Sequence, residues 1–199
     1  MEDTREHWPV TKSDVLLKHW LITVRSDQVQ MPDNQSAERM VVTHPGAVAI
    51  LALDEADRVL MIRQYRHPAG YLLWEIPAGL RDVAGEPLVE AARRELLEET
   101  GYRASQWHVL LDTFTSPGFT NERMRIFLAR GLEQAPDPGY EREHEEKFLT
   151  TAWVPLTEAV RLALEGKLHN GQAVTAVLAG SVARSGGFAG LRPADAPEN

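Results

Sequence analysis

Residues 46–66, GAVAILALDEADRVLMIRQYR, contain two apolar runs separated by a short polar stretch. Apolar runs of this length indicate β-strands, and DEAD at residues 54–57 is typical of the turn that joins two of them. The first run has almost no polar side chain, which is the pattern of a strand buried on both faces. The segment therefore predicts a β-hairpin whose first strand lies in the interior of the domain.

Strands and helices alternate along the rest of the chain. Trp20, Ile22 and Val24 alternate with other residues, which indicates one strand around them. Further strands are expected at residues 39–43, 72–76, 107–116, 123–131 and 150–156. Two helices are expected near the end, one with Thr157 as its N-cap and one capped by Asn170. This interleaving predicts an α/β or α+β protein.

The chain is expected to divide near residue 44. Residues 1–43 are predicted to form a small antiparallel β region. Two strands alone are marginal in water, so this region needs a partner surface, in the same chain or in a second copy. Residues 44–185 are predicted to form the main domain, and residues 186–199, rich in Gly, Pro and Ala, a flexible tail.

Charge and composition exclude several kinds of partner. The 199 residues carry a formal net charge of -8, so binding to nucleic acid, which needs a basic face, is not expected. The absence of cysteine excludes disulfides and thiolate chemistry. The run GAVAILAL is too short to span a bilayer, and the first residues show no secretory signal. We therefore expect no membrane association and a cytoplasmic location.

A second segment, PAGLRDVAGEPLVEAARRELLEETGY at residues 77–102, predicts a helix over residues 87–100. Successive side chains on a helix rotate by about 100°. Glu99 then falls within the apolar stripe of this helix and Glu95 on the edge of the stripe. Glu98 adjoins them on the other side. Two carboxylates thus occupy positions that an ordinary amphipathic helix fills with leucine or alanine.

These glutamates allow two explanations. They can belong to a solvated face with incidental Glu–Arg pairs, since Arg94 lies one turn before Glu98. They can also surround a divalent cation, because an unpaired buried carboxylate is costly. Hard cations such as Mg²⁺ take carboxylate oxygens together with substrate phosphates. Helix geometry alone leaves both explanations open.

The amino-acid sequence of this segment resembles the Nudix hydrolase signature, G-x5-E-x7-R-E-U-x-E-E-x-G-U, in which U is a bulky apolar residue. Glu86 is followed after seven residues by RELLEETGY at residues 94–102, in matching order. One position departs from the signature, since six residues instead of five separate Gly79 from Glu86. The resemblance covers roughly residues 14–180.

The flanking sequences are similar to the ADP-ribose pyrophosphatase branch of this family, in its actinobacterial type. They are RQYRHP, WEIPAG and SPGF, at residues 63–68, 74–79 and 116–119. Pro117 lies sixteen residues after Gly101, where a proline marks a preference for ADP-ribose in this branch. The paired strands before residue 44 resemble the branch's N-terminal dimerisation region.

The resemblance implies a three-layer α/β/α Nudix fold with a mixed sheet, plus a small N-terminal antiparallel β region for dimerisation. It implies a homodimer that uses Mg²⁺, or Mn²⁺, to hydrolyse the pyrophosphate of ADP-ribose to AMP and ribose 5-phosphate. Hydrolysis of another nucleoside diphosphate sugar stays open. A non-catalytic ADP-ribose-sensing regulator is a rival that predicts an eroded glutamate set and a basic module, and a purely structural domain predicts no metal dependence.

Carried over residue by residue, the resemblance implies metal ligands and an acid–base group. Glu95 and Glu99 match the metal ligands, and the backbone carbonyl of Ala78 matches a further ligand. Glu98 matches a supporting acid for a second or third metal ion, and it is counted among both the catalytic residues and the metal ligands. The catalytic base, also counted among the metal ligands, is expected to be Glu146, in the acidic run YEREHEEKF at residues 140–148. Glu145 is the near alternative.

The resemblance also implies substrate contacts. Arg66 matches the diphosphate-contacting arginine better than Arg63 does, and arginine forks suit phosphate oxygens. Pro117 and Gly118 are expected in the loop that contacts the substrate. The partner of the adenine ring stays open among four aromatic residues: Trp20, Tyr65, Trp74 and Phe119.

Overall fold

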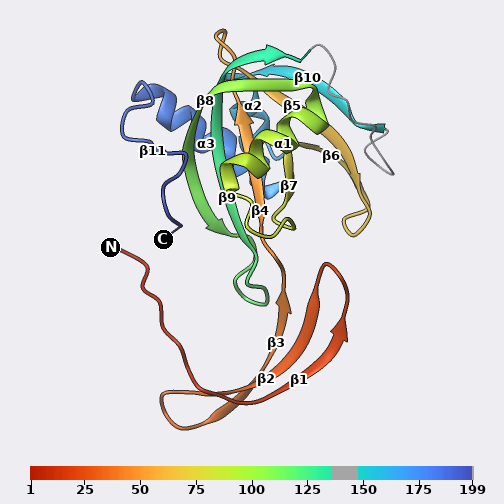
Figure 1. The fold of residues 1–199 in the computed structure, drawn as a ribbon, viewed down its shortest axis with the longest axis vertical. Helices are drawn as coiled ribbons and strands as arrows, with labels where there is room; N and C mark the ends of the chain where they lie inside the picture. The colour runs from red at the N-terminus through yellow and green to blue at the C-terminus, as the bar shows by residue number, and fades with distance from the viewer. Residues whose placement is uncertain (136–147, 199) are drawn as a thin grey trace. The chain divides into compact units, whose positions relative to one another are not determined.

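A computed structural model describes residues 1–135 and 148–198 of the chain (Figure 1). These residues form two compact units. Their bounds are Met1–Gly46 with Phe114–Arg123 for the first unit, and Ala47–Thr113 with the chain from Met124 onward for the second. The first unit ends close to the boundary expected near residue 44. It also contains a later loop that the prediction had left in the main domain.

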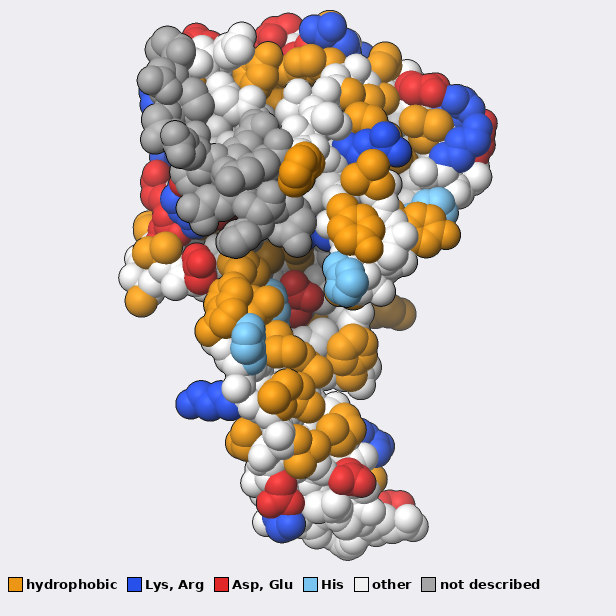
Figure 2. Space-filling model, turned by 90° about the vertical axis from the view of Figure 1, so that its right-hand side faces the viewer, with side chains coloured by type: hydrophobic (Ala, Val, Ile, Leu, Met, Phe, Trp, Pro, Cys, Tyr) orange, Lys and Arg blue, Asp and Glu red, His pale blue; other side chains and the backbone are white. Residues whose placement is uncertain are grey.

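The first unit contains an antiparallel sheet with the strand order β1-β2-β3. Its strands are β1 (Val10–Lys18), β2 (Thr23–Gln30) and β3 (Ser36–Thr43). β1 is exposed along its whole length. Hydrophobic side chains lie on the exposed surface of this unit (Figure 2), among them Val15, Leu16, Leu17, Trp20 and Met40.

The single strand predicted around Trp20 is wrong, because this residue lies in the turn between β1 and β2. The turn is closed by the His19 amide, which donates to the Ile22 carbonyl over 2.8 Å. The strands pair as far as Lys18 and Thr23, so the chain reverses within four residues. The apolar alternation that suggested one strand thus runs from this turn into β2.

The second unit is built around a five-stranded mixed sheet with the order β11-β8-β9-β4-β7. β4 runs parallel to β9 and antiparallel to β7, which confirms the predicted mixed sheet. The strands are β4 (Ala47–Ala52), β7 (Ala78–Leu80), β8 (Tyr102–Phe114), β9 (Arg123–Gln134) and β11 (Arg192–Pro193).

β4 is buried on both faces, as its apolar sequence predicts. Ala49 and Leu51 face a cluster that includes α2 (Leu156–Leu164) and α3 (Gly171–Ser185). Val48 and Ile50 face a second cluster that includes Ala91, Ala92 and Leu96 of α1 (Leu88–Thr100). Helices therefore cover both faces of the sheet, and the α/β/α arrangement is confirmed (Figure 1).

The hairpin predicted at residues 46–66 links two sheets. Its second strand, β5 (Arg58–Arg66), belongs to a three-stranded sheet with β6 (Tyr71–Glu75) and β10 (Thr150–Pro155). Asp54 shapes the turn, because its Oδ1 accepts from the amides of Ala56 (3.0 Å) and Arg58 (2.7 Å). The paired strands therefore diverge into separate sheets soon after the turn.

The helix starts were predicted with mixed success. Asn170 caps α3 as expected, since its side chain accepts from the Ala173 amide over 2.9 Å. The N-cap predicted at Thr157 is wrong, because α2 begins one residue earlier and Pro155 occupies the N-cap position without a side-chain bond. β10 runs directly into α2, and the buried Leu156 donates its amide to the carbonyl of Asp57 over 2.9 Å.

The flexible tail expected from residue 186 is also contradicted. Phe188 and Leu191 pack against the core, and Arg192 pairs with Val109 of β8. The sequence composition suggested disorder, but buried polar groups of the sheet bind this segment, as shown below for Arg125. In the described ranges, no helix combines the length and the apolar character that crossing a membrane requires.

Candidate active site

Glu99 links α1 to β7 at the edge of the central sheet. Its side chain is buried, at 5% relative exposure, among Ala91, Ala92 and Leu96. Its Oε2 accepts a hydrogen bond from the Ala78 amide over 2.8 Å. The predicted position of Glu99 within the apolar stripe is therefore confirmed, and a buried carboxylate is held against the backbone of β7.

The carbonyl of Ala78 points toward the same side as this carboxylate. Ile50 donates to the carbonyl of Pro77, so the next pair, Ala49 and Ala78, is a pair that exchanges no backbone hydrogen bonds. The amide and carbonyl of Ala78 then both point away from β4, on the side where the amide meets Glu99. β7 is the edge strand, so this carbonyl is available as an oxygen ligand.

Glu95 lies directly over Gly79. A Cβ atom built on Gly79 would stand 1.9 Å from the Glu95 Cδ and 2.1 Å from its Oε1. A side chain at this position would push the Glu95 carboxylate aside, so the glycine permits the close contact. The glycine thus brings the Glu95 carboxylate against β7, next to the strand's contact with Glu99.

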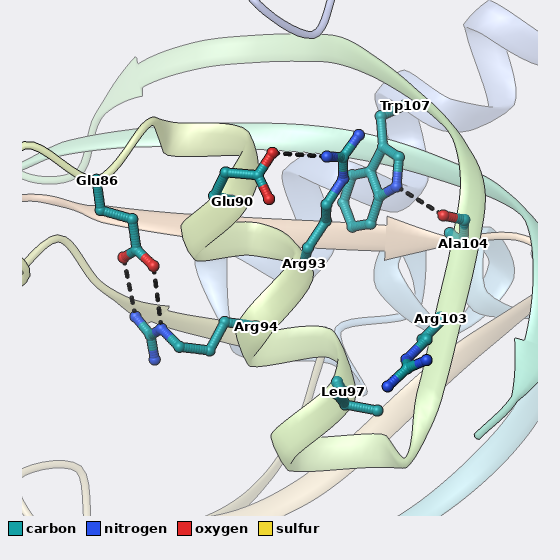
Figure 3. A pocket seen from close by; sticks show the side chains of 8 residues that line it. All are labelled: Glu86, Glu90, Arg93, Arg94, Leu97, Arg103, Ala104 and Trp107. Atoms are coloured by element: carbon teal, nitrogen blue, oxygen red, sulfur yellow. Dashed lines mark hydrogen bonds and ion pairs between the residues drawn. The ribbon is translucent and has the colours of Figure 1, made fainter. Parts of the chain in front are cut away.

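Arg94 joins the glutamates of the helix to the preceding loop. Its guanidinium reaches Glu95 Oε1 (2.6 Å), Glu98 Oε2 (3.2 Å) and both carboxylate oxygens of Glu86 (3.3 Å each). Figure 3 shows the two contacts with Glu86. Burial lowers the pKa of Arg94, but the bond to Glu86 and the charge of Glu95 outweigh it and raise the pKa. The predicted Arg94–Glu98 pair is confirmed.

The donor atoms of these groups are of the type that a hard divalent cation binds. Glu95, Glu99 and the Ala78 carbonyl offer only oxygen atoms, the donors that Mg²⁺ prefers. Within residues 1–135 and 148–198, however, no three His, Cys, Asp or Glu side chains gather closely enough to hold a metal by themselves. The expected set therefore depends on backbone or substrate oxygens and on Glu146, which, like Glu145, lies outside the described residues.

The two predicted arginines lie on β5 and face β6. Arg66 forms a two-pronged ion pair with Glu75, with Nε–Oε1 at 2.9 Å and Nη2–Oε2 at 2.6 Å. Glu75 is buried at 2% exposure, which sequence reasoning missed, although a lone carboxylate in the apolar strand YLLWE was the available signal. The Arg63 guanidinium lies over the Trp74 ring, 5.6 Å from its centroid. Tyr65 of the same strand is exposed.

Pro117 and Gly118 belong to the first unit, whereas the glutamates belong to the second. They form a turn in which the carbonyl of Ser116 accepts from the amide of Phe119 over 3.1 Å. The Phe119 carbonyl in turn accepts from the Val42 amide over 2.8 Å, which joins the turn to β3. Trp20 and Phe119, two of the adenine candidates, lie in this unit and are exposed.

A pocket of about 410 Å³ lies between α1 and the start of β8 (Figure 3). Arg94 and Glu86 line one side of it, and Arg93 and Trp107 line the other. The Arg93 guanidinium lies 5.9 Å from the centroid of the Trp107 ring. Of the predicted metal ligands that the structure describes, none lines this pocket, and sequence reasoning did not predict the pocket.

Comparison with known proteins identifies the family. Residues 43–176 match the NUDIX domain, and the chain belongs to the Nudix family, whose members generally use divalent metal ions. It is 46% identical over 183 residues to an ADP-ribose pyrophosphatase of Mycobacterium tuberculosis, a match that covers 92% of this chain and 87% of that protein. This confirms the resemblance read from the signature.

Two further comparisons concern another sequence relative and a solved structure. The chain is 34% identical over 166 residues to the methanol dehydrogenase activator of Bacillus methanolicus, covering 83% of this chain and 88% of that protein. A crystal structure of an ADP compounds hydrolase matches with a TM-score of 0.75 at 23% identity, covering 94% of this chain and 98% of that one. The structural match shows that the fold is shared.

Proposed function

We propose that this protein hydrolyses the pyrophosphate of ADP-ribose to AMP and ribose 5-phosphate with Mg²⁺ as the cofactor. The observation that carries this proposal is the placement of Glu95 and Glu99 against β7 within a Nudix signature. The relative that is 46% identical is an ADP-ribose pyrophosphatase and matches over most of both chains.

Glu95, Glu99 and the Ala78 carbonyl would hold the metal, with Glu98 as a supporting acid. Bound Mg²⁺, or Mn²⁺, lowers the pKa of a water molecule and neutralises phosphate charge. The protein's part is to hold these oxygens in place. Arg94 bridges the carboxylates of Glu95 and Glu98, because its Nη1 donates to both of them. The proposed base, Glu146 or alternatively Glu145, removes or orients the proton of the attacking water.

Arg66 is proposed to bind the diphosphate. Glu75 orients the Arg66 guanidinium by accepting hydrogen bonds from its Nε and Nη2. Arginine forks suit phosphate oxygens, because the planar guanidinium can donate two parallel hydrogen bonds to them. Arg63 is the second candidate for this contact. Pro117 and Gly118 are proposed to line the substrate site through the loop that carries them.

The β1-β2-β3 sheet is proposed to form a homodimer interface. Its exposed hydrophobic side chains, among them Val15, Leu17 and Trp20, support this assignment, because such side chains are seldom left in water as a group. The only other partner proposed is the nucleoside diphosphate sugar. The cytoplasmic location stays a prediction from the sequence.

A substrate panel tests the activity. Purified protein is assayed for release of nucleoside monophosphate from ADP-ribose, ADP-glucose, GDP-mannose, NADH and diadenosine polyphosphates, with Mg²⁺ and with a chelator. We expect AMP from ADP-ribose above all others, and none after chelation. A preference for a different sugar nucleotide would show that ADP-ribose is not the main substrate and would identify the one that is. Tight ADP-ribose binding without turnover would favour the sensor, and turnover in the chelator would refute the metal mechanism.

A further inference from the structure

Residues 186–198, here termed the C-terminal strap, lie along the central sheet beside β8 (Figure 1). Within the strap, β11 pairs with β8 through Arg192 and Pro193. Ala194 and Ala196 then pack against the cluster that contains the buried side chains of α1. The strap therefore shares a core with the helix that carries the glutamates, although the two are far apart in the sequence.

A buried arginine holds the strap. Arg125 is 2% exposed and lies in β9 two residues before Phe127, on the face that α1 covers. A buried guanidinium stays charged and must be paired. Asp112 supplies two bonds, of 2.7 and 2.9 Å, and the strap supplies the carbonyls of Ala196 (2.6 Å) and Pro197 (3.0 Å). The charge in the core is thus satisfied in part by strap backbone.

A second ion pair fastens the strap to the same carboxylate. Arg192 of the strap donates from Nη2 to Asp112 Oδ2 over 2.8 Å. Burial raises the pKa of Asp112, but hydrogen bonds from Arg125 and Arg192 outweigh it and lower the pKa. Asp112 therefore stays ionised and holds one arginine from the sheet and one from the strap.

The end of the strap reaches the loop before α1. Glu198 Oε1 lies 3.0 Å from Arg81 Nη1, and the two side chains are only 20% and 26% exposed. Arg81 directly follows β7 and begins the loop that is one residue longer than the signature requires. Asp82 and Glu86 of this loop face Arg94, at 4.0 and 3.3 Å.

We propose that Glu198 is a positioning residue for the hydrolysis, acting through Arg81. The pair fixes the lengthened loop, the loop presents Glu86 to Arg94, and Arg94 orients the carboxylates of Glu95 and Glu98. The strap is therefore a support of the metal-binding helix and not a tail. This inference rests on the proposed function, because it assigns the strap a role in that reaction.

The test compares Glu198→Gln with a matched control, Glu158→Gln. Glu158 also pairs with an arginine, but on α2, on the other face of the sheet. Binding of Mn²⁺ to the free protein is measured by electron paramagnetic resonance, and ADP-ribose turnover is measured against Mg²⁺ concentration. Hydrogen exchange reports on residues 81–87.

For Glu198→Gln we expect Mn²⁺ affinity to fall by about tenfold, at the low end of what distant supporting groups cost. The kcat should fall, exchange in the loop should quicken, and the melting temperature should change by less than about 3 °C, because the pair is partly exposed. The control should change none of these. The double variant Arg81→Glu/Glu198→Arg should recover Mn²⁺ affinity and kcat.

The outcomes separate this proposal from the function itself. Wild-type protein that binds Mn²⁺ but leaves ADP-ribose intact refutes the proposed function, and weaker Mn²⁺ binding with faster loop exchange in Glu198→Gln still supports the positioning role. Unchanged Mn²⁺ affinity and loop exchange in Glu198→Gln overturn the positioning role, whatever the substrate. An equal loss in the Glu158→Gln control overturns it as well.

Discussion

Replacing Gly79 by alanine is the sharpest perturbation that the site offers. The added methyl group would stand 1.9 Å from the Glu95 Cδ, whereas comfortable contacts begin at 3.4 Å. The difference, 3.4 − 1.9 = 1.5 Å, is the least distance by which the Glu95 carboxylate or β7 must move. The substitution therefore displaces a proposed metal ligand without removing any functional group.

The size of this displacement sets the expected effect on catalysis. Misplacing a reacting or ligating group by about 1 Å costs about a hundredfold in rate. We therefore expect kcat for ADP-ribose to fall by about a hundredfold or more, and the Mg²⁺ concentration for half-maximal activity to rise. The cost in folding stability should be small, because the added methyl group meets only the end of a flexible glutamate side chain.

Gly180→Ala separates the catalytic effect from the loss of stability. A Cβ atom there would stand 2.2 Å from Leu51 Cδ2, in the core between α3 and β4. We expect a larger loss of melting temperature than in Gly79→Ala, because Leu51 is fully buried, but an unchanged kcat at a temperature where the protein is folded. Kinetics with Mg²⁺ titration and thermal unfolding are measured on both variants. A Gly79→Ala protein with wild-type kcat and Mg²⁺ dependence would refute the assigned role of Glu95.

Three further predictions concern carboxylates that are paired with specific donors. Glu99→Gln keeps an acceptor for the backbone amide that it binds, so the fold should persist while kcat falls by about a hundredfold in a steady-state assay. Glu75→Gln removes the charge that directs Arg66, so KM for ADP-ribose should rise more than kcat falls. The pKa of Asp112 is lowered by its arginines, including Arg125, against the effect of burial. Its stabilisation is therefore present above the unfolded value of about 3.9 and is lost as pH falls through the lower folded pKa. Asp112→Asn should flatten the acid limb of melting temperature against pH, and an unchanged limb would contradict this.

Periodicity predicted the parts of the fold that depend on burial. The apolar run in β4 is buried on both faces because helices pack against both faces of the sheet. The same reasoning failed at Trp20, where an alternating pattern continues through a turn. Composition misled after residue 186, because a tail of small residues is held by Arg125 and Asp112, which lie far away in the sequence.

The candidate site divides in the same way. The burial of Glu99 follows from its angle on one helix, so the sequence predicts it. The pairing of Arg66 with Glu75 depends on how two strands pack side by side. The contact of Glu95 with Gly79 depends on how a helix packs against a strand. Such contacts between elements leave only weak traces in sequence, such as a lone carboxylate in an apolar strand or a glycine before a loop.

The two explanations first open for the glutamates turn out to be compatible. Arg94 does pair with Glu98, as an ordinary solvated face would predict, and it also binds Glu95 and Glu86. One arginine among three glutamates, however, leaves this set with a formal charge of 1 − 3 = −2. Arg94 alone can therefore order these carboxylates but cannot neutralise all three of them. Ordering by an arginine and binding of a divalent cation are thus not mutually exclusive.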